Sequence, residues 1–371
     1  MTLSGIGDAL MFSPALSVLR KNLPDAEIDL LCMIKGVKEI YLPRPAEAGY
    51  SVAGELNPKV NEVIHFNFMK EGFLKSLFFV LKLRRKYDVT FNVYPANRKE
   101  YNIISFLIGA KKRYAVRYLR SDISNLGFLN NQTIIENDSL HNVQENLALV
   151  KKFLNLPTIK EERMEIFLNP SHDQFAENFL LTTLNSKLKT KNHKQKTTNH
   201  QLLIGFHAGC ATLKNHIKRR WEPEKFARLG LLLKEKFNAE ILLFGGPDEY
   251  ELNSHINSLM NHSAIEVKTN TLIETASVMK RCDLFITNDS ALMHIASALG
   301  LKVVALFGPT NTNYVHPWKT EHVIVKTNLD CQPCFYYSPK PLTCTRTDLQ
   351  FKCIKDLSVE VVLDYVEGLI F

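Results

Sequence analysis

The chain after residue 201 alternates short apolar runs with stretches of helical periodicity, and this alternation constrains the fold more than any other feature. A short apolar run that ends at a glycine or a polar turn is typical of a buried strand. Strands that alternate with helices form a parallel sheet with helices on both faces, so the sequence predicts an α/β fold with a doubly wound sheet. Strands are expected at residues 202–206, 240–244, 284–287 and 302–307, and helices at 223–237 and 291–299.

The first half of the chain repeats this pattern less regularly. Helices are expected at residues 8–21 and 101–107, and strands at 28–32 and 89–93. No strand is predicted before the loop at 4–8, so the first strand is expected either to be absent or to have been misassigned. Because 371 residues exceed the length that one hydrophobic core usually serves, two domains are expected.

A lysine-rich segment lies near the middle of the chain. Residues 187–196 carry five lysines and no acid, which favours an exposed linker. A nucleic-acid-binding tail is the weaker alternative, because no aromatic residue is interleaved with the lysines. The predicted organisation is therefore an N-terminal Rossmann-like domain at 1–184, a linker at 185–201, a C-terminal domain at 202–355 and a final helix at 356–371.

Composition excludes several classes of protein. Hydrophobic residues make up 45% of the chain, yet the longest apolar stretch, 73–83, is interrupted by Lys75 and Lys82, so no membrane-spanning helix is expected. Residues 1–10 lack the basic flank and apolar run of a secretory signal, which predicts a cytoplasmic protein. The net charge of +8 favours anionic partners, and nucleic acid, anionic lipid and phosphorylated sugar all fit it.

A glycine-rich turn with a carboxylate opens the first predicted helix. Gly5, Gly7 and Asp8 would leave backbone N–H groups pointing toward a ligand beside an acid. An acid at this position is most often a helix cap. The functional alternative is a general base.

Three further turns follow predicted strands of the second half. The loop after residue 206 contains Lys214, Lys218, Arg219 and Arg220, a density of cations that suits a diphosphate or a solvated basic loop. The next turn, Gly245-Gly246, is followed by Glu249, an acid that could accept hydrogen bonds from ribose hydroxyls.

The third of these turns opens a helix at Asp289 and Ser290, whose hydroxyl and neighbouring amides would face the same crevice. Thr310, after the fourth strand, adds another hydroxyl. His294 lies one turn into the helix, where packing inside the protein and contact with a ligand are equally compatible with its position. Because the carboxyl ends of parallel strands share one edge of a sheet, these turns are expected to converge on a single site.

The run from Asn288 to Thr310, together with Arg219 to Pro223 and Ser4 to Pro14, resembles glycosyltransferase family 9, the lipopolysaccharide heptosyltransferases. The resemblance implies a GT-B fold, in which two Rossmann-like domains face each other across a cleft. It also implies inverting transfer that requires no metal or other cofactor. In that family the N-terminal domain would bind the acceptor and residues 202–355 the nucleotide-sugar donor.

The resemblance also implies roles for individual residues. Asp8 would deprotonate the acceptor hydroxyl, with Gly5 and Gly7 on the acceptor side. Arg219 would hold the donor diphosphate, Glu249 the ribose and Asp289 the transferred sugar. The full set of implied donor-binding residues is Lys218, Arg219, Glu249, Asp289, Ser290, Ala291, Met293, His294 and Thr310.

Two positions depart from the pattern of the family. Arg219 stands where a lysine is usual, which keeps the charge and changes its geometry. Ala291 stands where a glycine is usual, which is expected to tighten the approach of a phosphate.

A cluster of cysteines follows the predicted catalytic core. Four of the seven cysteines lie in the spacing Cys-x2-Cys-x9-Cys-x8-Cys, at Cys331, Cys334, Cys344 and Cys353. The first pair is a common half of a zinc site, but the second half lacks a close pair, so free thiols and a structural zinc are both open.

The predicted partners are a nucleotide-sugar donor, ADP-heptose by the resemblance, and a lipid-linked or glycan acceptor. Basic residues at 111–120 and the stretch 73–85 could contact the inner face of the cytoplasmic membrane, although an ordinary core helix is slightly favoured for that stretch. A nucleotide-sugar epimerase of similar fold is one alternative. A basic binding protein with a zinc knuckle is another, but such a module needs no converging strand ends, and nucleic acid is not an expected partner.

Overall fold

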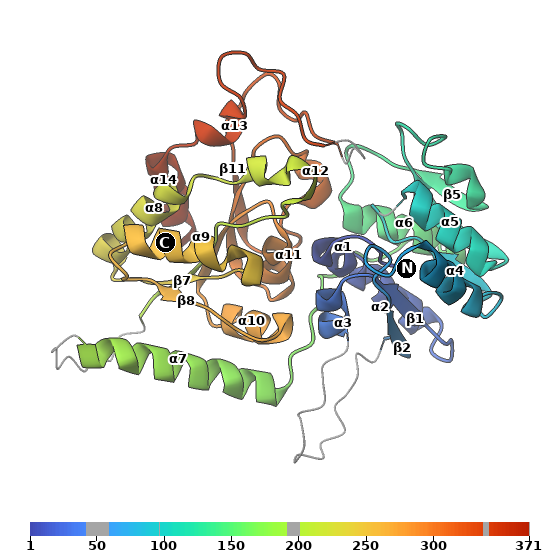
Figure 1. Ribbon diagram of the computed structural model, residues 1–371, viewed down its shortest axis with the longest axis horizontal. Coiled ribbons are helices and arrows are strands. Elements are labelled where there is room, and N and C mark those ends of the chain that lie inside the picture. The colour runs from blue at the N-terminus through green and yellow to red at the C-terminus, as the bar shows by residue number, and fades with distance from the viewer. Residues whose placement is uncertain (42–58, 96, 191–200, 337–340, 371) are drawn as a thin grey trace. The chain divides into compact units, whose positions relative to one another are not determined.

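The computed structural model describes residues 1–41, 59–95, 97–190, 201–336 and 341–370 (Figure 1). The chain divides into two compact units. The first comprises Met1–Phe167 with Asn313–Val315, and the second comprises Leu168–Thr312 with His316–Phe371. The predicted linker at 185–201 lies largely outside the described residues.

The boundary between the units lies at residue 167 rather than at 184. Helix α7 (Pro170–Thr190) packs against α10 (Leu272–Met279) and belongs to the second unit, as Figure 1 shows. Asp173 on α7 pairs with Lys280 at 3.1 Å and with Arg281 at 3.3 Å. The sequence prediction divided these residues between the first domain, up to 184, and the linker from 185. The contacts of α7 with α10 join residues about 100 positions apart, which periodicity does not reveal.

The second unit is built on a six-stranded sheet in the order β11-β10-β9-β6-β7-β8, in which every neighbouring pair is parallel. Numbered within the unit, the order is 6-5-4-1-2-3, the arrangement of a dinucleotide-binding sheet. The strands are β6 (Leu203–His207), β7 (Glu240–Leu243), β8 (Ile265–Glu266), β9 (Leu284–Asn288), β10 (Lys302–Leu306) and β11 (His322–Val325). The four predicted strands therefore match β6, β7, β9 and β10 within a residue or two.

Helices cover both faces of this sheet because each presents an apolar stripe. The helix α8 (Pro223–Phe237) starts with proline at its first position and ends where Asn238 adopts a left-handed conformation. Its buried face carries Phe226, Leu229 and Leu233. The other elements are η2 (Leu213–Arg219), η3 (Pro247–Glu249), α9 (Tyr250–Leu259), α11 (Ala291–Ala298), α12 (Thr312–Val315), which lies mostly with the first unit, α13 (Lys352–Lys355) and α14 (Val359–Ile370).

The first unit contains two sheets, β1-β2 and β3-β4-β5, all of whose pairings are parallel. Its strands are β1 (Asp29–Cys32), β2 (Glu62–His65), β3 (Val89–Phe91), β4 (Lys112–Arg117) and β5 (Gln132–Ile135). Its helices are α1 (Ile6–Met11), α2 (Ser13–Asn22), α3 (Lys35–Tyr41), α4 (Phe73–Lys82), α5 (Lys99–Ile108), η1 (Gly127–Leu129) and α6 (Asn142–Leu154).

The first residues of the chain join these two sheets. The Thr2 amide donates to the Leu31 carbonyl at 2.8 Å, and the Val93 amide donates to the Met1 carbonyl at 3.0 Å. Thr2 also forms a parallel bridge with Cys32. Met1–Leu3 thus occupies the place of a first strand between β1 and β3. Of the two alternatives that the sequence left open, an absent first strand and a misassigned start, the structure supports the misassigned start. The full order, 3-2-1-4-5-6, is the same as in the second unit.

The predicted helix at 8–21 is broken into α1 and α2 at Phe12. Pro14, at the second position of α2, has no N–H, and its ring would collide with the Leu10 carbonyl in a continuous helix. The Ser13 hydroxyl donates to that carbonyl at 2.7 Å instead.

Helix α4 packs one face on the core of the first unit, where Val80 joins Leu31 and Ile104, as expected for the amphipathic helix that the sequence slightly favoured. Its exposed part nevertheless carries large apolar side chains. Phe73 and Leu74 are 77% and 78% exposed, and only Val80 on this helix is fully buried. Within the described part of the chain, no helix combines the length and apolarity that a membrane crossing requires.

Leu3 offers a test of whether the segment Met1–Leu3 joins the two sheets of the first unit. Its side chain is 1% exposed and packs with Leu31, Val80 and Ile104. We expect Leu3→Ala to lower the free energy of unfolding by about 2–5 kcal/mol, because it leaves a cavity between the two halves of the first unit. Urea denaturation measures this change. The matched control is Leu74→Ala, at an exposed position of α4, whose free energy of unfolding should stay within about 0.5 kcal/mol of the wild type. Equal losses of stability in the two variants would contradict the buried position of Leu3 between the sheets.

Candidate active site

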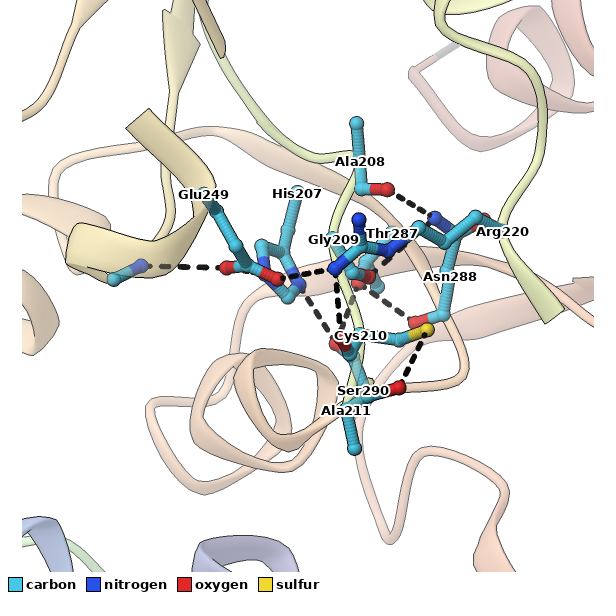
Figure 2. Close-up of polar contacts among 11 residues, drawn as sticks. His207, Ala208, Gly209, Cys210, Ala211, Arg220, Glu249, Thr287, Asn288 and Ser290 are labelled. Atoms are coloured by element: carbon cyan, nitrogen blue, oxygen red, sulfur yellow. Dashed lines mark hydrogen bonds and ion pairs between the residues drawn. The ribbon is translucent and has the colours of Figure 1, made fainter. Parts of the chain in front are cut away.

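The functional residues of the second unit gather where its strand order reverses. Strand β6 pairs with β7 on one side and with β9 on the other, so the connections leave in opposite directions and the carboxyl ends of β6 and β9 stay uncovered. His207 ends β6 and Asn288 ends β9. Figure 2 shows both residues with the side chains around them.

His207 lies between Glu249 and Ser290. Its Nε2 is 2.9 Å from Glu249 Oε2, and its Nδ1 is 2.8 Å from Ser290 Oγ. The Gly246 amide also donates to Glu249, at 3.3 Å. Burial would raise the pKa of Glu249, but the hydrogen bond to His207, the nearby charges and this amide outweigh it, so the pKa lies below its usual range. Glu249 is therefore an ionised, nearly buried carboxylate at neutral pH.

Glycine at position 209 makes room for this carboxylate. A Cβ on Gly209 would lie 1.7 Å from Glu249 Oε1, a distance that no side chain tolerates. The guanidinium of Arg220 donates to the Cys210 carbonyl at 2.8 Å and to Glu249 at 3.3 Å, so it ties the loop after β6 to the carboxylate. Burial raises the pKa of the Cys210 thiol, which keeps this cysteine neutral.

A second ion pair joins Arg219 to Asp289. Arg219 Nη1 lies 2.5 Å from Asp289 Oδ2, and both side chains are almost entirely buried. Arg219 Nη2 is 3.3 Å from His216 Nδ1. Lys218, which was predicted to accompany Arg219, is exposed. Arginine suits this pairing because its planar group presents several N–H donors in a fixed geometry.

Asn288 holds the loop after β6 in place. Its amide group donates to the Ala208 carbonyl at 2.8 Å, and its oxygen accepts from the Trp221 backbone amide at 3.0 Å. The Trp221 indole donates to the Leu357 carbonyl at 2.8 Å, which anchors the far end of the loop. Both ends of the cation-bearing loop are thereby fixed to the sheet.

Helix α11 starts directly after this cluster. Ser290 is its N-cap, and within the described chain its hydroxyl makes no capping bond to the helix. Ala291 begins the helix, whereas the side chains of Met293 and His294 are buried inside the unit. Burial lowers the pKa of His294 to about 4, with His316 adding to the effect and Asp289 opposing it.

Two buried polar atoms near this helix have no hydrogen-bond partner among the described residues. They are His294 Nδ1 and the hydroxyl of Thr310. An unsatisfied buried polar group costs about 1–3 kcal/mol, so both atoms are candidates for contact with a ligand.

In the first unit, Asp8 lies at the equivalent point, after the strand at Met1–Leu3 and at the start of α1. Its Oδ2 accepts from the Gly5 amide at 2.8 Å, so the capping role expected for this acid is present. A Cβ on Gly5 would lie 3.2 Å from that oxygen, and Gly7 is buried. Burial raises the pKa of Tyr101, and the Asp8 carboxylate adds to this increase while Arg98 opposes it.

The four clustered cysteines are free thiols in the structure. Burial raises the pKa of Cys353 to about 11, with further increases from Cys334, Cys344 and Cys331. Among the residues that the structure describes, no group of three or more acidic, histidine or cysteine side chains is arranged to hold a metal ion. A structural zinc at this cluster stays a prediction.

Sequence reasoning missed two central residues of the site. His207 and Asn288 are buried polar side chains at the last positions of strands, where the pattern of the sequence shows only the end of an apolar run. A polar residue that closes an otherwise apolar strand was the available signal for both.

Comparison with known proteins identifies the family. Residues 79–341 match the model of glycosyltransferase family 9 (heptosyltransferase), which covers more than half of the chain. The chain belongs to glycosyltransferase family 9. Lipooligosaccharide heptosyltransferase 2 of Campylobacter jejuni is 36% identical over 157 residues, 41% of this chain and 47% of that protein. The chain thus matches about half the length of the first curated relatives.

Solved structures show the fold. The family 9 glycosyltransferase of Veillonella parvula has a TM-score of 0.73 and 21% identity, with coverage of 99% of this chain and 95% of that chain. The ADP-heptose lipopolysaccharide heptosyltransferase II of Escherichia coli has a TM-score of 0.67 and 17% identity, with coverage of 100% and 97%. The predicted GT-B fold of two Rossmann-like units is confirmed.

The space beside Glu249 provides a test of the site geometry. Gly209→Ala should displace the carboxylate and lower the free energy of unfolding by about 1–3 kcal/mol, because a methyl group is forced against a buried charge. The control is Gly246→Ala, since a Cβ there meets nothing within 4 Å and the amide that donates to Glu249 is kept. Denaturant unfolding measures the free energy of unfolding of both variants. Equal values would contradict the close packing of Glu249 against Gly209.

Proposed function

We propose that this chain is an inverting, metal-independent glycosyltransferase that moves a heptose from ADP-heptose to a lipopolysaccharide core or a related glycan. Family membership supports sugar transfer, and the name of the similar E. coli enzyme supports both the donor and the acceptor. The observation that carries the proposal is the cluster at the ends of β6 and β9, where buried cations, carboxylates and a helix N-terminus meet.

The donor would bind along this cluster from ribose to sugar. Ionised Glu249 accepts hydrogen bonds from ribose hydroxyls, and the amides at the start of α11 receive the diphosphate. Arg219 binds the diphosphate from the other side, while its pairing with Asp289 fixes both groups. Asp289 then contacts hydroxyls of the sugar. These groups stabilise the negative charge that grows on the departing diphosphate.

Asp8 would act as the general base. It takes the proton of the acceptor hydroxyl while the acceptor oxygen bonds to the anomeric carbon and the bond from that carbon to the diphosphate oxygen breaks. A single displacement of this kind inverts the anomeric configuration. The bond between Asp8 and the Gly5 amide fixes one carboxylate oxygen and orients the group.

Asp8→Asn separates catalysis from donor binding. The amide oxygen can still accept from the Gly5 amide, but it cannot take a proton, so transfer should fall by roughly 10²- to 10⁴-fold. Formation of the product from ADP-heptose and a truncated core acceptor is followed by mass spectrometry, and binding of ADP by calorimetry should be unchanged. Arg219→Ala, in contrast, should weaken ADP binding.

Other outcomes contradict parts of the proposal. Full activity of Asp8→Asn removes this residue as the base. Conversion of the nucleotide sugar without an acceptor indicates an epimerase, and the absence of ADP binding by the wild type excludes the donor site.

We also propose that the surface of the first unit around α4 contacts anionic lipid. Helix α4 packs on α5, and α5 packs on η1, and each of the three elements exposes large apolar side chains. Exposed cations accompany them, and Lys82 Nζ lies 4.7 Å from the centre of the Phe78 ring. The apolar residues are Phe73, Leu74, Phe78, Leu81, Ile103, Phe106 and Phe128, and the exposed cations of the adjacent chain are Lys70, Lys75, Lys82, Arg84, Arg85 and Lys86. Apolar insertion and charge attraction together favour the surface of an anionic bilayer.

Vesicle co-sedimentation tests this surface. The wild type should bind vesicles that contain phosphatidylglycerol and bind phosphatidylcholine vesicles weakly. A triple variant, Phe73→Ser, Leu74→Ser and Phe78→Ser, should lose most of the binding without a loss of stability, since these side chains are exposed. The control is Leu181→Ser, a residue 60% exposed on α7 of the other unit. Unchanged binding by the triple variant would refute the assignment.

A further inference from the structure

The cysteine-bearing chain after β11 lies against two loops of the proposed donor site. Its described stretches 331–336 and 341–344, which form the supporting segment, carry three of the four clustered cysteines. They contact the turn after β10, which carries Thr310, and the loop after β6, which carries Arg219. The proposed transfer reaction gives this segment no role of its own.

The first stretch of the supporting segment is bonded to the turn after β10. The amides of Cys334 and Phe335 both donate to the Pro309 carbonyl at 3.0 Å, and the Asn311 amide donates to the Phe335 carbonyl at 3.2 Å. Phe335 also forms a parallel bridge with Thr310. Backbone hydrogen bonds therefore fix the turn that carries Thr310.

The second stretch is bonded to the loop after β6. The Leu342 amide donates to the Lys214 carbonyl at 2.9 Å, and the Leu342 carbonyl accepts from the side-chain amide of Asn215 at 2.8 Å. Because a carbonyl oxygen can only accept, the nitrogen of the Asn215 side chain must face it. Leu342 is 2% exposed and belongs to the apolar core of the unit, so the loop is tied to a fixed point.

The loop that these bonds hold has an unfavourable backbone conformation. Lys214 and Asn215 both lie in the left-handed region, with φ of 56° and 64°. This region costs a residue such as lysine about 1–2 kcal/mol, whereas asparagine tolerates it better. The two hydrogen bonds to Leu342 offset that cost and keep the loop in one conformation.

A series of side-chain contacts leads from the supporting segment to Arg219. The buried ring of Phe335 meets the His216 ring edge-on, with the ring centres 5.3 Å apart and the planes at 78°. His216 Nδ1 lies 3.3 Å from Arg219 Nη2, and the other terminal nitrogen of Arg219 pairs with Asp289. Phe335 is thus in contact with both the Thr310 turn and the residue beside the Arg219 guanidinium.

We infer that the supporting segment positions Arg219 for the donor diphosphate, with Asn215 and Phe335 as the positioning residues. This inference rests on the proposed function. Asn215 acts by fixing the loop, and Phe335 acts through the His216 ring. Loss of either contact should leave the Arg219 guanidinium less well oriented, so a diphosphate binds more weakly while the unit stays folded.

Asn215→Gly removes the side-chain bond to Leu342 and keeps the backbone conformation, because glycine adopts the left-handed region readily. Calorimetry should show that ADP binds about three- to tenfold more weakly, as expected for the loss of one hydrogen bond. The matched control is Asn238→Gly, the same exchange at an exposed, left-handed asparagine at the end of α8. This control should bind ADP as the wild type does, and thermal unfolding of both variants should be similar.

A double-variant cycle tests whether the effect passes through Arg219. Arg219→Lys keeps a positive charge but has no planar set of donors, so the His216 ring no longer orients the cation. In that background, Asn215→Gly should change the affinity for ADP by less than about twofold. An equal loss of affinity in the Arg219→Lys and wild-type backgrounds overturns the inference.

Phe335→Leu changes the other contact and keeps an apolar side chain in the core. It should also weaken ADP binding, which keeps the inference testable if Asn215→Gly fails to fold. Wild-type affinity in either folded variant overturns the inference and leaves the proposed donor site intact. Absence of ADP binding by the wild type overturns the proposed donor site as well.

Discussion

The parallel pairing of β6 with β9 is the contact on which the second unit depends. At this pairing the strand order reverses, so the helices that follow the two strands leave toward opposite sides and the strand ends remain uncovered. Polar side chains are tolerated at those ends, whereas in the middle of the strands they would be buried in the apolar core. Asn288 uses the position to hold the loop after β6, and His207 uses it to reach Ser290 and Glu249.

The strand order reverses in the first unit as well, and there the central position is formed by only a few residues. Met1–Leu3 pairs with β1 on one side and contacts the chain at β3 on the other, and the turn that follows carries Asp8. One topological rule therefore places the proposed base in one unit and the proposed donor site in the other. In both units an acid or a hydroxyl stands at the start of the helix that follows a central strand.

The sequence predicts the sheet of the second unit well, because local periodicity and glycine turns mark each strand and helix there. It also predicts the turns that meet at the site, including Arg219 and Asp289. It does not predict their pairing, which joins residues 70 positions apart. The roles of His207 and Asn288 escaped prediction for the same reason. The break at Phe12 could have been predicted from Pro14. The exposure of α4, in contrast, depends on tertiary packing, which cannot be read from periodicity.

The two departures from the family pattern differ in their structural consequences. Ala291 replaces a glycine, but the extended conformation before the helix falls on Ser290, with φ −154° and ψ 170°, and Ala291 is the first helical residue. Glycine is not required there for the backbone, so the methyl group affects only how closely a ligand approaches. Arg219 stands where a lysine is usual, and its planar guanidinium contacts both Asp289 and His216. A lysine ammonium is a compact charge without a planar set of donors, so it would not contact both groups in the same geometry. In this chain the orientation of Asp289 therefore depends on the arginine.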